Sequence, residues 1–293
     1  VAVVRDADRR SRFFRDGLVE QCTEVRETLA SASRLLAEYR PDVVLHLAAQ
    51  TQVPVANTDP LSTFESNVRG TWLLLEACRT NAKSPTAIVV ASSDKAYGAG
   101  ALPYTENSPL KAVAPYDVSK AATDLVARSY GLHFGLPVVV TRCGNIYGPG
   151  DLNEARLVPG VCLSLARGES PTLRSTGTMS REWLYVDDAA QATLLLARNA
   201  SAHSGEAFNV GGGETATASA IAQRLISESG RQLVPQTAEA DPPGEIAHQS
   251  LDSSRIHELG WAPQVSLDEG LKRTWAWYRR IFSNPSLRVQ GRA

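Results

Sequence analysis

The stretch Thr-Ala-Ile-Val-Val-Ala-Ser-Ser-Asp-Lys at residues 86–95 joins a continuous apolar run to polar residues at its carboxyl end. A short apolar run without polar alternation is typical of a strand that is buried on both faces. In an open parallel sheet, ligands bind at the carboxyl ends of the strands, so Ser93, Asp94 and Lys95 are expected to face a site. A strand-to-loop turn with a capping side chain would explain Ser93 or Asp94, but it gives no reason for Lys95.

The chain around this stretch alternates apolar runs of strand length with longer segments of helical pattern. Strands are expected at 1–4, 43–48, 87–91 and 138–142, and helices at 31–38, 64–80 and 117–133. Such alternation predicts βαβ units and therefore an α/β fold with a doubly wound parallel sheet. After Gly150 the pattern is less regular and prolines punctuate short elements, which predicts a smaller C-terminal lobe.

Tyr116 and Lys120 are four residues apart at the start of the helix expected at 117–133, so they share one helix face. An ammonium beside a phenol favours the phenolate, and lowering the tyrosine pKa from about 10 to neutrality takes roughly 4 kcal/mol. Such a tyrosine acts as a base on a substrate hydroxyl. The alternative is an ordinary surface pair, which the scarcity of lysine disfavours, since the chain has 5 lysines in 293 residues.

The composition excludes several classes of protein. A net charge of -1 gives no electrostatic footprint for nucleic acid or for an anionic membrane. No apolar run reaches the ~18 residues of a membrane span, so a cytoplasmic protein is expected. Four widely spaced cysteines without a C-x-x-C pattern predict reduced core thiols, with no metal site and no disulfide framework: Cys22, Cys78, Cys143 and Cys162.

These segments, taken with four others, resemble the extended short-chain dehydrogenase/reductase family in its NAD-dependent epimerase/dehydratase branch. The other segments lie at 46–50, 67–71, 142–150 and 181–188. The resemblance implies a Rossmann-like dinucleotide-binding domain over 1–150 and a mainly substrate-binding lobe over 151–293, from which about 181–200 return to the main domain. Ser-Asp-Lys at the strand end is most similar to the CDP-glucose 4,6-dehydratase subgroup, whereas dTDP-glucose dehydratases carry Asp-Glu there.

The resemblance also implies the chemistry, in which an NDP-hexose becomes its 4-keto-6-deoxy product through transient oxidation at C4. Tyr116 would take the proton of the 4-hydroxyl, Lys120 would hold the nicotinamide ribose, and Ser93 would hydrogen-bond the 4-hydroxyl and Tyr116. Asp94 would be the acid that protonates the departing 6-hydroxyl. Lys95 would be the C5 base if neutral, and otherwise it would order a water or steady the enolate.

The implied cofactor is NAD, with NADP as the alternative because Arg5, Arg9 and Arg10 surround Asp6. Two departures from the family stand at the start of the chain. The Gly-x-x-Gly-x-x-Gly turn that admits a pyrophosphate does not occur, so the first βα unit is expected to be missing, and Thr28 stands where relatives contact adenine. The cofactor-binding residues implied by position are Asp6, Leu47, Ala48, Ala49, Asn67, Ser92, Tyr116, Lys120 and Cys143.

The implied substrate is a nucleotide-diphosphate sugar, whose diphosphate suits the forked donors of arginine. Its expected contacts are Gln50, Ser93, Asn145, Arg156, Arg174, Arg181 and His248. Relatives usually pair through the helices near 64–80 and 117–133, which implies a homodimer. Two alternatives remain open: a 4-epimerase on the same fold, and a catalytically silent binding relative without the pyrophosphate turn.

Overall fold

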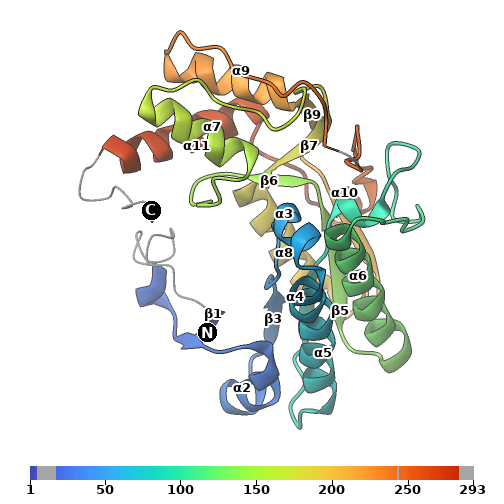
Figure 1. Ribbon diagram of the computed structural model, residues 1–293. Coiled ribbons are helices and arrows are strands. Elements are labelled where there is room, and N and C mark those ends of the chain that lie inside the picture. The colour runs from blue at the N-terminus through green and yellow to red at the C-terminus, as the bar shows by residue number, and fades with distance from the viewer. Residues whose placement is uncertain (5–17, 243, 284–293) are drawn as a thin grey trace.

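A four-stranded parallel sheet forms the centre of the molecule in the computed structural model, which describes residues 1–4, 18–242 and 244–283 (Figure 1). The strand order is β3-β4-β5-β8, and every neighbouring pair is parallel. The strands are β3 (Val43–His46), β4 (Ala87–Ala91), β5 (Val138–Cys143) and β8 (Ala207–Val210). The predicted α/β fold is confirmed, although β8 was not among the expected strands.

The N-terminal segments form a separate parallel pair of strands, β1 (Ala2–Val4) and β2 (Glu24–Arg26). Short turns of helix at Leu18–Gln21 (η1) and Leu29–Ser31 (η2) lead to α2 (Ala32–Tyr39). Among the described residues, β3 pairs with β4 alone, so its other edge has no strand beside it. Val43 and Leu45 of this edge strand are exposed at 46% and 40%.

Helices cover both faces of the main sheet, and β4 shows why its sequence has no polar alternation. Ile88 and Val90 pack into a cluster with α2, α5 (Gly70–Thr80) and α6 (Pro115–Phe134). Ala87 and Val89 pack on the opposite face against α8 (Val186–Asn199) and α10 (Ser254–Glu258). A strand covered on both faces needs apolar side chains at every position.

The helix expected at 64–80 is formed by the last residue of α4 (Pro60–Phe64), a π-helical turn η3 (Glu65–Arg69) and α5, and the short helix α3 (Val53–Thr58) precedes them. The carboxylate of Asp59 accepts from the Ser62 amide and so begins α4 anew, with Pro60 in its first turn. At the π-turn, the main-chain oxygen of Asn67 accepts from the hydroxyls of Thr71 and Thr123, which ties this segment to α6.

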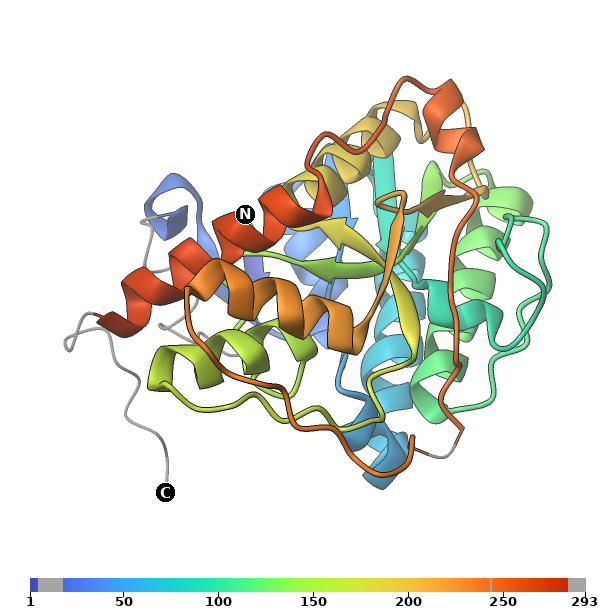
Figure 2. The same cartoon turned by 90° about the horizontal axis from the view of Figure 1, so that it is seen from above.

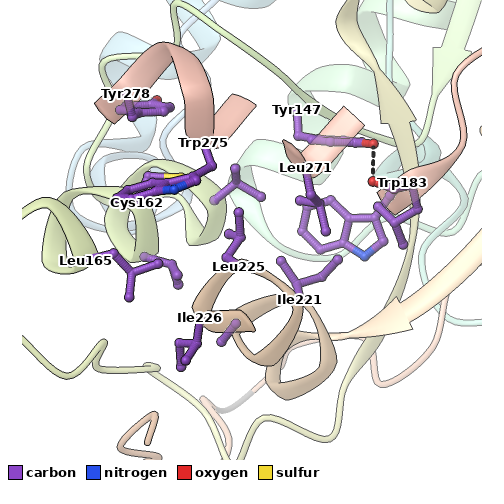
Figure 3. Close-up of a cluster of buried hydrophobic side chains, with 14 of the residues drawn as sticks. Tyr147, Cys162, Leu165, Trp183, Ile221, Leu225, Ile226, Leu271, Trp275 and Tyr278 are labelled. Atoms are coloured by element: carbon purple, nitrogen blue, oxygen red, sulfur yellow. Dashed lines mark hydrogen bonds between the residues drawn. The ribbon is translucent and has the colours of Figure 1, made fainter. Parts of the chain in front are cut away.

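A second lobe consists of a three-stranded sheet and three packed helices. The sheet contains β6 (Asn145–Tyr147), β7 (Ser180–Tyr185) and β9 (Glu214–Thr217), and the helices are α7 (Leu157–Arg167), α9 (Ala218–Ser229) and α11 (Leu267–Ser283). The helices lie side by side at one end of the molecule (Figure 2). Their core includes Ile221, Leu225, Leu271 and Trp275 (Figure 3). No described helix is long and apolar enough to cross a membrane.

The segment expected to return to the main domain, about 181–200, divides between the two parts. Its first residues belong to β7 in the small sheet, where the indole of Trp183 donates to the carbonyl of Ala216 at 3.1 Å. The following helix α8 lies on the main sheet, with Ala192 and Leu196 fully buried there. Residues 207–210 also return to the main sheet as β8.

A buried ion pair joins α6 to β5. The guanidinium of Arg142 donates to both oxygens of Asp124 at 2.7 and 2.9 Å, and both side chains are almost completely buried. Arg142 also donates to the hydroxyl of Tyr97 at 2.9 Å, and its guanidinium lies 4.9 Å from the centroid of that ring. Tyr97 in turn donates to Asn209 of β8. One arginine therefore connects two strands, a helix and the turn after β4.

We expect Asp124→Ala to lower the free energy of unfolding by about 3–5 kcal/mol, because it leaves the buried Arg142 charge without its partner. Glu38→Ala, which removes an exposed pair with Arg34, is the control and should change the free energy by less than about 1 kcal/mol. Urea denaturation followed by circular dichroism gives both values. Equal effects of the two substitutions would contradict a central role for the buried pair.

Candidate active site

The carboxyl end of β4 presents the polar residues that the sequence singled out. The hydroxyl of Ser93 accepts from the Lys95 amide at 3.2 Å and donates to Asp94 at 3.0 Å, so it begins the short helical turn η4 (Asp94–Tyr97). The hydroxyl of Ser92 donates to the main-chain oxygen of Lys120 at 3.1 Å. The Ser92 bond holds the strand end against α6.

Tyr116 and Lys120 lie on the buried face of α6, next to the end of β4. The ammonium of Lys120 donates to the Ala91 carbonyl at 2.8 Å. Burial lowers the pKa of Lys120 to about 8, and Cys143 opposes this shift. The side chain therefore faces the ends of β4 and β5.

The pKa of Tyr116 is raised in this structure, whereas the sequence predicted a lowered one. Burial raises the pKa of the Tyr116 phenol above its usual value, and Asp94 and Asp117 raise it further. Arg156 and a hydrogen bond with Ser93 oppose the shift. The physical reason is that removing a phenolate from water costs more than the nearby cations return.

Asp94 has the environment of a general acid. Its side chain is almost completely buried, and its Oδ2 atom has no hydrogen-bond partner among the described residues. Burial raises the pKa of this carboxyl, against the lowering effects of Lys95, Ser93 and Arg181. A carboxyl whose pKa is raised by burial is suited to donate a proton to a leaving group.

Two cations and a carboxylate meet beside Asp94. Arg181 of β7 donates to Glu245 at 3.0 Å and to the carbonyls of Ser180 and Ala247. The same Glu245 oxygen lies 4.0 Å from the ammonium of Lys95. The sequence did not single out Glu245, because only the chain's return past β7 brings it to these cations.

Asp117 is a second residue that the sequence left unassigned. It follows Tyr116 directly, is 6% exposed, and lines a pocket with Lys95, Asn57 and Glu245. Burial raises its pKa to about 6; Lys95 and Arg181 oppose the shift, and Glu245 and Asp94 add to it. The one signal in the sequence that could have identified Asp117 was its position next to Tyr116. That signal is weak, because the residue after a tyrosine on a helix need not face the same site.

Two residues predicted to contact ligands hold the loop after β3 through their side chains. The Asn67 amide accepts from the Gln50 main-chain N–H at 2.6 Å and donates to the Gln50 carbonyl and to Ser119. The Gln50 side chain donates to Gln52 and Thr63. Both side chains thus form hydrogen bonds within the protein, and these bonds position the segment 47–50.

The remaining predicted residues differ in position. Leu47 and Ala48 are exposed at the end of β3, Ala49 is half-buried, and Cys143 ends β5 close to Lys120. Asn145 begins β6, and Arg156 pairs with Asp151 and Thr51 near enough to Tyr116 to affect its pKa.

Arg174 and His248 are both exposed. Arg174 has no partner among the described residues, whereas His248 bonds Ser180 at 2.9 Å. Asp6, with Arg5, Arg9 and Arg10, lies outside the described residues.

The residues present fit the nicotinamide end of a dinucleotide. The Lys120 ammonium has three N–H donors and uses one of them within the described residues, so two remain for ribose hydroxyls. Lys120, Tyr116, Ser92 and Cys143 would hold this end. Between Val1 and Arg69 the one glycine is Gly17, so this stretch has no glycine-rich turn for a pyrophosphate.

Comparison with known proteins agrees with this geometry. The model of the NAD dependent epimerase/dehydratase family matches residues 4–211, and the chain belongs to that family. A dTDP-glucose 4,6-dehydratase of Shigella flexneri is 32% identical over 272 residues, which cover 84% of this chain and 74% of the relative. One of Streptomyces griseus is 35% identical over 243 residues, covering 82% and 72%.

Similar solved structures include both a 4-epimerase and a 4,6-dehydratase. A UDP-glucose 4-epimerase of Thermotoga maritima with UDP-glucose has a TM-score of 0.83 and 28% identity, covering 91% of this chain and 87% of that chain. A dTDP-glucose 4,6-dehydratase of Streptomyces venezuelae, with NAD bound, has a TM-score of 0.81 and 33% identity, covering 90% and 82%. These relatives do not carry the CDP-glucose specificity suggested by Ser-Asp-Lys.

We expect the buried ammonium of Lys120 to give a characteristic pH dependence of stability. With a folded pKa of about 8 against a usual 10.5, the unfolded chain binds more protons between these values, so stability rises with pH in that window. Lys120→Met removes this dependence. The difference in unfolding free energy between the parent protein and Lys120→Met should therefore grow by about 3 kcal/mol from neutral pH to the top of the window.

Chemical denaturation at a series of pH values measures this difference. Lys83→Met serves as the control, because Lys83 is exposed on the surface. A parent-minus-variant difference that stays constant with pH would contradict a desolvated Lys120.

Proposed function

We propose that this protein is a nucleotide-sugar 4,6-dehydratase that uses NAD. The observation that carries the proposal is the buried carboxyl of Asp94, which has a raised pKa and an unpartnered oxygen beside Tyr116. Loss of the 6-hydroxyl as water needs a proton donor, and a protonated Asp94 supplies one. A 4-epimerase needs no such acid, although the similarity to UDP-glucose 4-epimerase keeps that reaction as the second candidate.

The proposed roles follow from the positions of the side chains. Bound NAD would supply the acceptor for the C4 hydride. Tyr116 takes the 4-hydroxyl proton, and its raised pKa means that ligands must favour the phenolate before it acts. Ser93 bonds both Asp94 and Tyr116, which places it to orient the sugar hydroxyl. Lys120 holds the nicotinamide ribose.

The nucleotide sugar is proposed to lie between the main sheet and the second lobe. Arg181 is only 8% exposed and is positioned by the carbonyls of Ser180 and Ala247, and a diphosphate would replace Glu245 as the partner of its other terminal nitrogen. Arg156 and Asn145 lie on the same side, at the start of α7 and in β6. The part up to residue 150 would then hold mainly the cofactor, and the part after it mainly the substrate.

The finer assignment is a CDP-glucose type of dehydratase. Its support is Ser93-Asp94-Lys95 at the end of β4, where the dTDP-glucose dehydratases carry Asp-Glu. The similarity to dTDP-glucose dehydratases supports the reaction and not this nucleotide. A direct comparison of substrates is therefore required.

We expect the protein with NAD to convert CDP-glucose to a 4-keto-6-deoxy product faster than dTDP-, UDP- or GDP-glucose. Mass spectrometry separates the two candidate reactions, because dehydration removes water while epimerisation leaves the mass unchanged. Tyr116→Phe should lower turnover by about 10²–10⁴-fold while the protein stays folded. An isomer of unchanged mass would favour the epimerase, and a faster reaction with dTDP-glucose would overturn the CDP-glucose assignment.

We also propose a homodimer formed through α4, α5 and α6. Leu61, Trp72 and Leu125 on these packed helices are exposed at 72%, 43% and 56%. Large apolar side chains grouped on neighbouring helices are typical of a protein contact surface.

Sedimentation velocity should show a dimer for the parent protein and a monomer for Leu125→Glu. Leu194→Glu on α8 is the control, since Leu194 is exposed on a different helix. A parent protein that remains monomeric at tens of micromolar would contradict the dimer.

A further inference from the structure

Asp117 has no structural role that accounts for its burial. The residue is 6% exposed, and no described residue donates a hydrogen bond to its carboxylate, whereas buried carboxylates are ordinarily paired. An acidic residue in the first turn of a helix often compensates the helix dipole. Such residues usually lie in water, as does Asp187 in the first turn of α8.

The unpartnered carboxylate of Asp117 lines a pocket rather than the protein core. The other residues that line this pocket include Lys95, Ala114, Gly244, Glu245 and Ile246. Tyr116, which precedes Asp117, lies beside Asp94 and Ser93. A ligand that reaches Tyr116 and Lys95 therefore passes next to the carboxylate of Asp117.

The charges around Lys95 bear on which group accepts the C5 proton. Glu245 lies 4.0 Å from the Lys95 ammonium, and Asp117 and Asp94 both interact with it electrostatically. An ammonium among carboxylates is suited to hold the negative oxygen of an enolate and poorly suited to accept a proton. Position in the family pattern suggested Lys95 as the base, but its surroundings favour the electrostatic role.

We propose that Asp117 is the base that removes the C5 proton, and that Lys95 stabilises the resulting enolate. The inference rests on the proposed dehydratase function. In this step an Oδ of Asp117 bonds to the C5 proton, and the C5–H electron pair forms the enolate. That pair then forms the C5–C6 double bond as the C6–O bond breaks, and the 6-hydroxyl leaves as water with a proton from Asp94. The C4 hydride would return from reduced nicotinamide to C6, while Asp117, after exchanging its proton with solvent, protonates C5.

The acidity of Asp117 is suited to this step at neutral pH. Its pKa is about 6, because burial, Glu245 and Asp94 raise it while Lys95 and Arg181 lower it. These four residues are the charged groups that face Asp117, and they come from η4, the segment at 244–246 and β7. A base whose pKa lies slightly below the working pH is both ionised and basic enough to take a proton. By contrast, Glu245 already accepts from the guanidinium of Arg181 at 3.0 Å.

The test uses the full chain with NAD and the nucleotide sugar of the panel that reacts fastest, deuterated at C5. It follows cleavage of the C4–H bond and of the C5–D bond separately. Absorbance of reduced nicotinamide reports hydride loss from C4, and release of deuterium to solvent reports cleavage at C5. For Asp117→Asn we expect C4 oxidation within a few-fold of the parent and C5 release at least about 100-fold slower. Asp187→Asn is the matched control and should leave both rates unchanged.

The pH profile of C5 release shows whether Asp117 or Lys95 accepts the C5 proton. The parent's C5 release should fall as the pH drops through about 6, because a protonated Asp117 accepts no proton. This acidic limb should persist in Lys95→Gln and disappear in Asp117→Asn. Intact C4 oxidation shows that the Asp117→Asn protein is folded.

Parental C5 release in Asp117→Asn, or loss of the acidic limb in Lys95→Gln, would overturn the inference while leaving the dehydratase function in place. Absence of the 4-keto-6-deoxy product from the parent protein would overturn the proposed function, and this inference with it.

Discussion

The buried pair of Asp124 and Arg142 is the constraint on which the candidate site depends. Its two charge-assisted bonds bring α6 against β5, and the third arm of the guanidinium reaches Tyr97 in the turn after β4. Tyr116 and Lys120 belong to that helix, while Ser93, Asp94 and Lys95 belong to that turn. A buried pair contributes little net stability compared with apolar packing, but breaking it is costly, so it admits few other arrangements of these elements.

Burial then assigns different properties to similar groups within the site. Asp94, Asp117 and Glu245 are all carboxylates near Lys95 and Arg181. Asp94 is the most enclosed and burial raises its pKa, Asp117 lines the pocket with a pKa of about 6, and Glu245 forms an ion pair with Arg181 at 3.0 Å. Their differences come from solvation and from the nearest charge rather than from residue type.

The second lobe contributes to the candidate site through strand β7. Glu182 of β7 is buried and accepts from the amides of Gly213 and Leu251, which fixes the segments on either side of the strand. The next residue back along the strand, Arg181, points to Glu245. Because neighbouring residues of a strand face opposite sides, β7 anchors the lobe with one side chain and supplies the site with the other.

The sequence by itself determined the α/β class, the strands at 87–91 and 138–142, and the meeting of Ser93, Asp94 and Lys95 with Tyr116 and Lys120. These follow from local rules, namely apolar runs, helical spacing and the position of strand ends. Tertiary structure alone decided that Asn67 and Gln50 are occupied within the protein and that Tyr116 is less acidic than expected. It also decided that Asp117 and Glu245 join the site. The reason is that burial and charge proximity arise between segments far apart in the chain, where no spacing rule reaches.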